Sequence, residues 1–353
     1  MNPSNPTEFN TAPAGGHGFF IYRLPGSNVP DGYAGRVNSF TGPEKGFVIY
    51  PFTTADFPSV VVSPDSPITP GMGDAIVAEM RASDSWTTPK CLLSCNSTSK
   101  EEHKRMVERT VEAIREHKLL KSIISRTIVS DVRLNLSKTF NSLCSHYPGA
   151  FVFWYYTPAT GMWMGASPEL LLEKEGTALR TMALAGSRPT GSDGPWDEKN
   201  MNEHRIVTDF ICTRFREAGT EPIVEETRNC AAGPVTHLMT PIHATARDNE
   251  ALDLATRLSP TPALGGMPQK GAVSWISSTE RHPRGYYGGF IGPADSNGDY
   301  RFFVNLRSML IMPDKVCQFS GGGIMEESVA DDEWEETERK ADTLRRLFIS
   351  TEK

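Results

Sequence analysis

Lys121-Ser122-Ile123-Ile124-Ser125-Arg126 is the stretch of sequence that decides the fold. Its adjacent isoleucines are β-branched and favour a strand, on which side chains point alternately to opposite faces. Lys121 then shares its face with Ile123 and Ser125. A lysine on an apolar face loses hydration, which disfavours the ammonium form, lowers its pKa and makes Lys121 a candidate general base. In the alternative interpretation, Lys121 lies at a sheet edge and its ammonium reaches water.

The overall composition is that of an ordinary globular protein. The chain has 353 residues, of which 38% are hydrophobic and 22% are charged, and its net charge is -7. This charge offers no basic surface for nucleic acid or an anionic membrane, so an anionic substrate needs a local cluster of cations. The sequence contains no run of about 18 apolar residues, so no membrane-spanning helix is expected.

The N-terminal residues and the cysteines indicate the cellular compartment. Residues 1–16 contain no lysine or arginine and no apolar core, so we expect a disordered tail and not a signal peptide. The cysteines show no paired metal-binding spacing, so we expect reduced thiols in a cytoplasmic protein. The six cysteines are Cys91, Cys95, Cys144, Cys212, Cys230 and Cys317.

Hydrophobic periodicity predicts that strands and helices interleave through the whole chain. We expect strands at 19–22, 46–50, 121–126, 150–156, 161–166 and within 285–319, and helices at 101–118, 136–146, 202–217, 250–258, 268–278 and 331–348. Because no clean boundary separates these elements, we expect residues 17–353 to form a single large α+β domain.

Carboxylates on two of the predicted helices are candidate metal ligands. Glu203 lies on an apolar stripe with Val207, so it should face inward or line a cavity. Glu333, Glu336 and Lys340 follow one another at three- and four-residue steps on the last helix. Oxygen ligands from two helices are what Mg²⁺ prefers. Alternatively, acids in a first helical turn complement the helix macrodipole.

Further polar residues have positions that favour binding or catalysis. Glu169 precedes an apolar run, where desolvation would raise its pKa and make it a proton donor, or where it would cap nearby amides. Arg307 lies in a predicted strand and is a natural partner for a substrate carboxylate. His237 would polarise a substrate group or have a structural role. The glycines of 184–187 and 320–324 would bring backbone N–H groups close to an anion.

These pieces, in this order, resemble the chorismate-utilising enzymes and, within them, the isochorismate synthases. The motif-bearing part covers roughly residues 119–348, and the joint match is specific although each piece alone is not. The matching segments are Lys121 to Arg126, 165–169, 184–187, Glu203-His204, 237–240, 259–266, 284–289, 305–308, 321–324 and 333–337.

The resemblance implies large antiparallel sheets flanked by helices and a site that binds chorismate and Mg²⁺. Lys121 resembles the base that activates water for attack at ring carbon 2. Glu169 resembles the acid that protonates the departing hydroxyl at ring carbon 4. Glu203 and Glu336 resemble the Mg²⁺ ligands, with Glu333 reaching the ion through a water.

The remaining substrate contacts follow from the same resemblance. Gly186 and Ser187 correspond to positions at the ring carboxylate. The enolpyruvyl carboxylate is expected to lie at Tyr287, Arg307, Gly323 and Lys340.

Two positions discriminate between branches of the family. The relatives that use ammonia have glutamine where this chain has Lys121, so no amidotransferase subunit is expected as an obligatory partner. Salicylate synthases typically have threonine where this chain has Ala263. The chain departs from the family pattern at Ser259, where histidine is frequent, and at Gly265 and Gly322, where serine or alanine is usual. These departures leave the ionisable residues of the site unchanged and affect how the substrate would be positioned.

Three functions are compatible with these residues. The first is a Mg²⁺-dependent isomerase that converts chorismate to isochorismate for menaquinone or siderophore synthesis. The second is a salicylate synthase, which would add a loss of pyruvate. The third is a non-catalytic relative that binds chorismate or a partner subunit, and the retained Lys121, Glu169, Glu203 and Glu336 argue against it.

Overall fold

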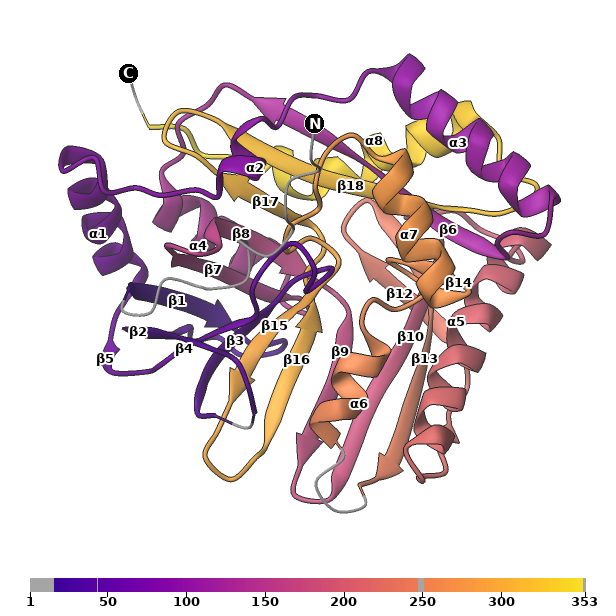
Figure 1. The fold of residues 1–353 in the computed structure, drawn as a ribbon, viewed down its shortest axis with the longest axis horizontal. Helices are drawn as coiled ribbons and strands as arrows, with labels where there is room; N and C mark the ends of the chain where they lie inside the picture. The colour runs from indigo at the N-terminus through magenta and orange to yellow at the C-terminus, as the bar shows by residue number, and fades with distance from the viewer. Residues whose placement is uncertain (1–15, 43, 247–250, 352–353) are drawn as a thin grey trace, which may run out of the picture.

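A computed structural model describes residues 16–42, 44–246 and 251–351 of the chain. The predicted tail, apart from Gly16, lies outside the described residues. Within the described residues, all strand pairings are antiparallel, and the strands form two large sheets joined through β2 (Asp31–Ser39). Helices flank both sheets (Figure 1). The predicted fold class is therefore confirmed.

The first sheet contains the strand that begins at Lys121. From one edge of this sheet to the other, the strands are β14 (Gly266–Met267), β6 (Lys121–Ser130), β18 (Val316–Ile324), β17 (Ser308–Ile311), β8 (Gly161–Ser167), β7 (Phe151–Thr157), β1 (His17–Arg23), β2 and β5 (Ser66–Pro67).

The second sheet begins at β2, which belongs to both sheets. In spatial order it contains β4 (Val60–Val62), β3 (Gly46–Tyr50), β15 (Phe290–Ala294), β16 (Tyr300–Val304), β9 (Leu170–Glu175), β10 (Ala178–Pro189) and β13 (Val235–Thr245), with β11 (Ile223–Val224) and β12 (Arg228–Ala232) both paired to the outer side of β13.

Eight helices in the described residues cover these sheets. They are α1 (Pro70–Ala82), α2 (Lys90–Leu93), α3 (Lys100–Arg115), α4 (Leu136–His146), α5 (Glu198–Glu217), α6 (Ala251–Leu258), α7 (Gln269–Thr279) and α8 (Ala330–Arg345). In Figure 1, α3, α7 and α8 lie over β6 and β18, and α5 runs along β10 and β13.

Side chains alternate between the two faces of β6, so one face packs in a hydrophobic core and the other faces the candidate site. Ile124 belongs to a buried apolar cluster with Val107 of α3 and Ala272 of α7. Lys121 and Ile123 point to the other face, where Ile123 lines a cavity between the two sheets. The predicted placement of Lys121 on the face of Ile123 is confirmed, and the alternative of a solvent-exposed edge lysine is excluded because its side chain has 0% exposure.

The prediction that all six cysteines are reduced thiols is wrong for one pair. Cys95, in the loop after α2, forms a disulfide with Cys317 of β18, 222 residues later in the chain. No local sequence spacing predicts this pair, because the fold brings together two cysteines that are far apart in the chain. The other four cysteines are free.

Within the part of the chain that the structure describes, no helix is both long enough and apolar enough to cross a membrane.

Candidate active site

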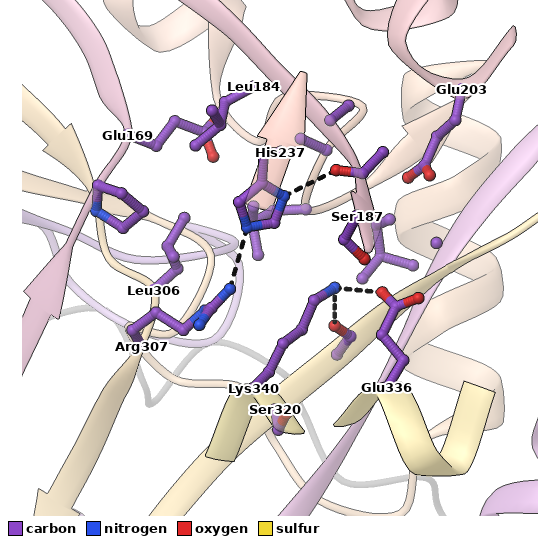
Figure 2. A pocket seen from close by; sticks show the side chains of 18 of the residues that line it. Glu169, Leu184, Ser187, Glu203, His237, Leu306, Arg307, Ser320, Glu336 and Lys340 are labelled. Atoms are coloured by element: carbon purple, nitrogen blue, oxygen red, sulfur yellow. Dashed lines mark hydrogen bonds and ion pairs between the residues drawn. The ribbon is translucent and has the colours of Figure 1, made fainter. Parts of the chain in front are cut away.

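A cavity of about 60 Å³ lies between the two sheets, where β6 and β18 of the first sheet face β10 and β13 of the second. Helices α5 and α8 close one side (Figure 2). All residues predicted for the site line this cavity except Lys121 and Glu333, which lie directly behind it. The predicted residues that line it are Glu169, Gly186, Ser187, Glu203, His237, Ala263, Tyr287, Arg307, Gly323, Glu336 and Lys340.

Lys121 and Glu203 form a buried ion pair at the back of the cavity. The distance from Lys121 Nζ to Glu203 Oε1 is 2.9 Å, and the side chains are 0% and 11% exposed. Glu203 comes from α5, and Lys121 begins β6. The structure thus brings the predicted base into direct contact with a predicted metal ligand.

Two further carboxylates on α8 each pair with a lysine. Lys340 Nζ donates to Glu336 Oε1 at 2.5 Å and to the carbonyl of Gly321 at 3.0 Å. Lys199, one turn before Glu203 on α5, donates to Glu333 Oε1 at 2.6 Å. Each of the three acids therefore has one lysine partner, so the site is nearly neutral within a small volume.

The pKa values of the two carboxyl groups on α8 shift in opposite directions. Burial alone would raise the pKa of Glu336, but the ammonium of Lys340 outweighs it and lowers that pKa to about 2. Burial and the negative charge of Glu336 raise the pKa of Glu333. Glu336 is consequently the carboxylate that keeps its charge most firmly.

The acids surround a stretch of β18 that has no side chains. A Cβ on Gly323 would lie 2.1 Å from Glu203 Oε1, and one on Gly322 would lie 2.9 Å from Glu333 Oε2. Only glycine therefore lets the carboxylates approach this strand. Glu333 Oε2 is buried and has no hydrogen-bond partner among the residues that the structure describes.

This donor set fits a hard divalent cation. Three carboxylates converge from two helices, one buried oxygen lacks a partner, and oxygen ligands suit Mg²⁺. The carboxylates do not form a ready coordination shell, since no three His, Cys, Asp or Glu side chains among the described residues are already grouped to hold a metal. Glu203 Oε1 and Glu336 Oε1 are paired with lysines, so an ion would bind the second oxygen of each carboxylate or replace the lysine.

Glu169 lies across the cavity from Glu203 (Figure 2). Glu169 comes shortly after β8 in the sequence and is 2% exposed. Burial raises the pKa of its carboxyl to about 8, although the positive charge of Lys121 opposes this shift. Within the described part of the chain, its side chain accepts one hydrogen bond, a long one of 3.4 Å from the Thr261 hydroxyl. At neutral pH the carboxyl of Glu169 is therefore protonated, and its role as the catalytic acid stays a prediction.

A β-bulge places Gly186 and Ser187 in the cavity wall. The register of β10 against β13 shifts between Ala185 and Arg188, so that two residues stand opposite His237 alone. Gly186 has φ +72°, which glycine adopts readily. The Ser187 N–H donates to the Asn200 side chain at 2.8 Å, which fixes the bulge to the first turn of α5.

His237 uses both ring nitrogens within the protein. Nδ1 lies 2.8 Å from the Gly186 carbonyl, and Nε2 lies 3.1 Å from Arg307 Nη2. Burial, followed by the charge of Arg307, lowers its pKa to about 3. A neutral ring that donates from Nδ1 and accepts at Nε2 satisfies both contacts. His237 therefore orients Arg307, and its predicted role of polarising a substrate group stays a prediction.

Arg307 is held at the junction of β16 and β17. Its Nη1 donates to the Thr343 hydroxyl at 2.7 Å, and its backbone has φ +49°, in the left-handed region. Burial lowers its pKa to about 10, so the guanidinium remains charged at neutral pH. In Figure 2 it lies on the side of the cavity opposite Glu203 and Glu336.

Several residues of the site were not identified from the sequence. Lys199 pairs with Glu333, and the Asn200 side chain accepts from the Ser187 N–H in the bulge. Lys199 is four residues before Glu203, a spacing that puts both side chains on one helix face. The apolar walls were also missed, because nothing distinguishes them from core residues. The apolar residues that line the cavity include Ile123, Leu184, Leu264, Leu306 and Phe319.

Comparisons with known proteins agree with this geometry. The family described as "Chorismate binding enzyme" matches residues 74–348. The isochorismate synthase EntC of Escherichia coli strain K12 is 32% identical over 258 residues, which are 69% of this chain and 66% of that protein. The isochorismate synthase MenF of Bacillus subtilis strain 168 is 31% identical over 268 residues, 70% of this chain and 56% of that protein.

A solved structure supports the fold independently. The menaquinone-specific isochorismate synthase MenF of Escherichia coli superposes with a TM-score of 0.74 at 21% sequence identity, covering 98% of this chain and 92% of that chain. The sequence alignments span two thirds or less of the curated relatives' length. The family match extends over most of the chain and includes every residue of the cavity, and we conclude that the chain belongs to the chorismate binding enzyme family.

Proposed function

We propose that this protein is a Mg²⁺-dependent isochorismate synthase that interconverts chorismate and isochorismate. One observation carries the proposal: the buried Lys121 lies behind one cavity beside Glu203, and the carboxylic acid of Glu169 lines that cavity together with the cations Arg307 and Lys340. Its relatives named isochorismate synthases support the same reaction.

Lys121 is the base in this reaction. Released from Glu203, its neutral amine takes a proton from a water molecule whose oxygen bonds to ring carbon 2. The ring double bonds shift, and the hydroxyl on ring carbon 4 leaves. Glu169 gives that hydroxyl its proton, so that it departs as water. One water enters and one leaves, and the two enzyme groups exchange protons with solvent before the next turnover.

The other residues of the site position a substrate with two carboxylates. Arg307, oriented by His237 and Thr343, would bind the enolpyruvyl carboxylate together with Tyr287. The backbone of the Gly186–Ser187 bulge faces the ring carboxylate. Mg²⁺, held by Glu203 and Glu336 with Glu333 behind them, would neutralise substrate charge.

Chromatography of the products tests the proposal. Purified protein incubated with Mg²⁺ and either chorismate or isochorismate should approach the same mixture of the two, because the reaction moves one hydroxyl between similar positions. Ala263 resembles the residue of synthases that stop at isochorismate, so little salicylate is expected. Salicylate and pyruvate formed in equal amounts, as fast as chorismate disappears, would identify a salicylate synthase instead.

A further inference from the structure

A second cavity, of about 330 Å³, adjoins the active site. We call it the outer pocket. It shares Pro168 and Arg307 with the active-site cavity, so these two residues form the wall between them. Its other walls are the end of α4 at Tyr147, the tip of the β12–β13 hairpin at Ala232, and the end of α8 at Arg346.

The charge of the outer pocket is opposite to that of the whole chain. The net charge of the chain is -7. Among the described residues that line the outer pocket there is no aspartate or glutamate, while Arg307 and Arg346 both contribute guanidinium groups. A cationic cavity with no acid in its lining favours anions, because field lines concentrate in a concave, low-dielectric space.

Hydrogen bonds link both arginines of this cavity to Thr343. Arg346, which is exposed, donates to the Tyr147 hydroxyl at 2.9 Å, and that hydroxyl donates to the Thr343 carbonyl at 2.8 Å. Arg307, which is buried, donates to the hydroxyl of the same Thr343. One cation thus faces solvent, and the next faces the active site.

The volumes of the two cavities differ in a way that matters for a ligand. The active-site cavity, at about 60 Å³, is far below the roughly 300–1,000 Å³ of ordinary ligand pockets, whereas the outer pocket falls within that range. A ten-carbon dicarboxylate therefore fits first in the outer pocket. Movement of Arg307 would then admit it to the active site.

We propose that the outer pocket is the route by which the dianionic substrate reaches the active site, and that Arg346 is the cation that attracts it. This proposal rests on the proposed function, which supplies the dianion. Arg346 acts on the approach of the substrate and does not contact the reacting atoms. Its loss should therefore slow association without changing the chemical step.

Stopped-flow measurement of chorismate association, followed by tryptophan fluorescence, tests the route. Arg346→Gln should lower the association rate constant by about three- to tenfold at low salt, as expected for one charge acting on a dianion through partly screening water. The same variant should show a weaker dependence of that constant on salt, with kcat unchanged. Arg346→Lys should restore both the constant and its salt dependence.

Arg345→Gln is the matched control, since it removes the same charge from the adjacent residue of α8. Arg345 pairs with Glu338 and Asp342 and does not line the outer pocket, so association should remain as in the wild type. If Arg346→Gln and Arg345→Gln show the same rate constants at every salt concentration, the proposed role of Arg346 is overturned.

A second variant tests the path without changing any charge. Ala232→Phe narrows the outer pocket at the hairpin tip and should slow both association and dissociation several-fold, with Kd less affected than either rate. Unchanged rates in a variant with wild-type thermal unfolding would overturn the route. Failure of the wild-type protein to convert chorismate would contradict the proposed function, which the product assay measures separately.

Discussion

Lys121 and Glu203 face each other across 2.9 Å, in an ion pair that is almost completely removed from solvent. The pair joins the first residue of β6 to α5 at the back of the active-site cavity. Because a buried ion is costly without its partner, each residue stabilises the other's charged form in the resting protein. Function and stability are therefore coupled at this position.

Replacing Lys121 should affect activity and stability together. We expect Lys121→Ala to lower kcat by about 10² or more through loss of the base. It should also lower the free energy of unfolding by about 3–5 kcal/mol, because Glu203 is left buried without its partner. The double variant Lys121→Met/Glu203→Gln should regain much of that stability and none of the activity. Product assays and chemical denaturation measure the two effects, and near-normal turnover of either variant would rule out Lys121 as the base.

Glu169 should determine the alkaline limb of the pH profile. With a pKa of about 8, its carboxyl is protonated at neutral pH and loses its proton as the pH rises through that value. The rate should therefore fall above about pH 8. Glu169→Gln should lower kcat by about 10² and abolish this limb. A variant that retains both the rate and the alkaline limb would show that another group is the acid.

The same shift has a consequence for stability. Folding raises the pKa of Glu169 from 4.5 to about 8, so the stability that its protonated carboxyl contributes is fully present below pH 4.5, falls as the pH rises from there, and is lost by about pH 8. Glu169→Gln should remove this part of the pH dependence. Thermal unfolding of both proteins across this pH range measures the difference.

The dependence on Mg²⁺ can be tested at Glu336, whose charge is the most firmly held. Excess chelator should abolish turnover, and full activity in chelator would exclude a metal requirement. Glu336→Gln should weaken Mg²⁺-dependent chorismate binding in titration calorimetry, since it removes an anionic ligand and frees Lys340. Glu335→Gln, at an exposed neighbouring position on α8, is the control and should bind normally. Equal binding by the two variants would remove Glu336 from the ligand set.

Gly323 gives a steric test of the same site. A Cβ at this position would lie 2.1 Å from Glu203 Oε1, so Gly323→Ala should displace that carboxylate and lower kcat/KM by at least tenfold. Gly42→Ala is the control, because a Cβ there would meet nothing within 4 Å and Gly42 lines neither the active-site cavity nor the outer pocket. Identical kinetics in both variants would show that the carboxylate moves away at no cost.

Part of the fold follows directly from local sequence. Apolar periodicity predicts a helix at residues 136–146, and α4 has those bounds. Helix α1 was not predicted, because Gly71 and Gly73 weaken the helical signal. It forms because Thr69 caps it and because the absence of a side chain at Gly73 makes room for Trp154, whose ring a Cβ there would approach to 2.8 Å. That contact exists only in the folded protein.

The candidate site was likewise predictable only in part from the sequence. Its ionisable residues could be named from motifs, and the structure gathers them at one cavity. Their pairing could not be predicted, since Lys199 and Glu333 are 134 residues apart and meet only after α5 and α8 have docked. The role of His237 depended on the β-bulge, which shifts the strand register and turns its ring between Gly186 and Arg307.

The left-handed backbone of Arg307 implies a conflict between what this protein needs for folding and what it needs for binding. A non-glycine residue at φ +49° costs on the order of 1–2 kcal/mol. The substitution Arg307→Gly would relieve that cost but would remove the cation between the two cavities. A library of variants sorted for thermal resistance alone should therefore enrich Arg307→Gly and other inactive sequences, whereas selection for growth that depends on product made by the enzyme should retain arginine.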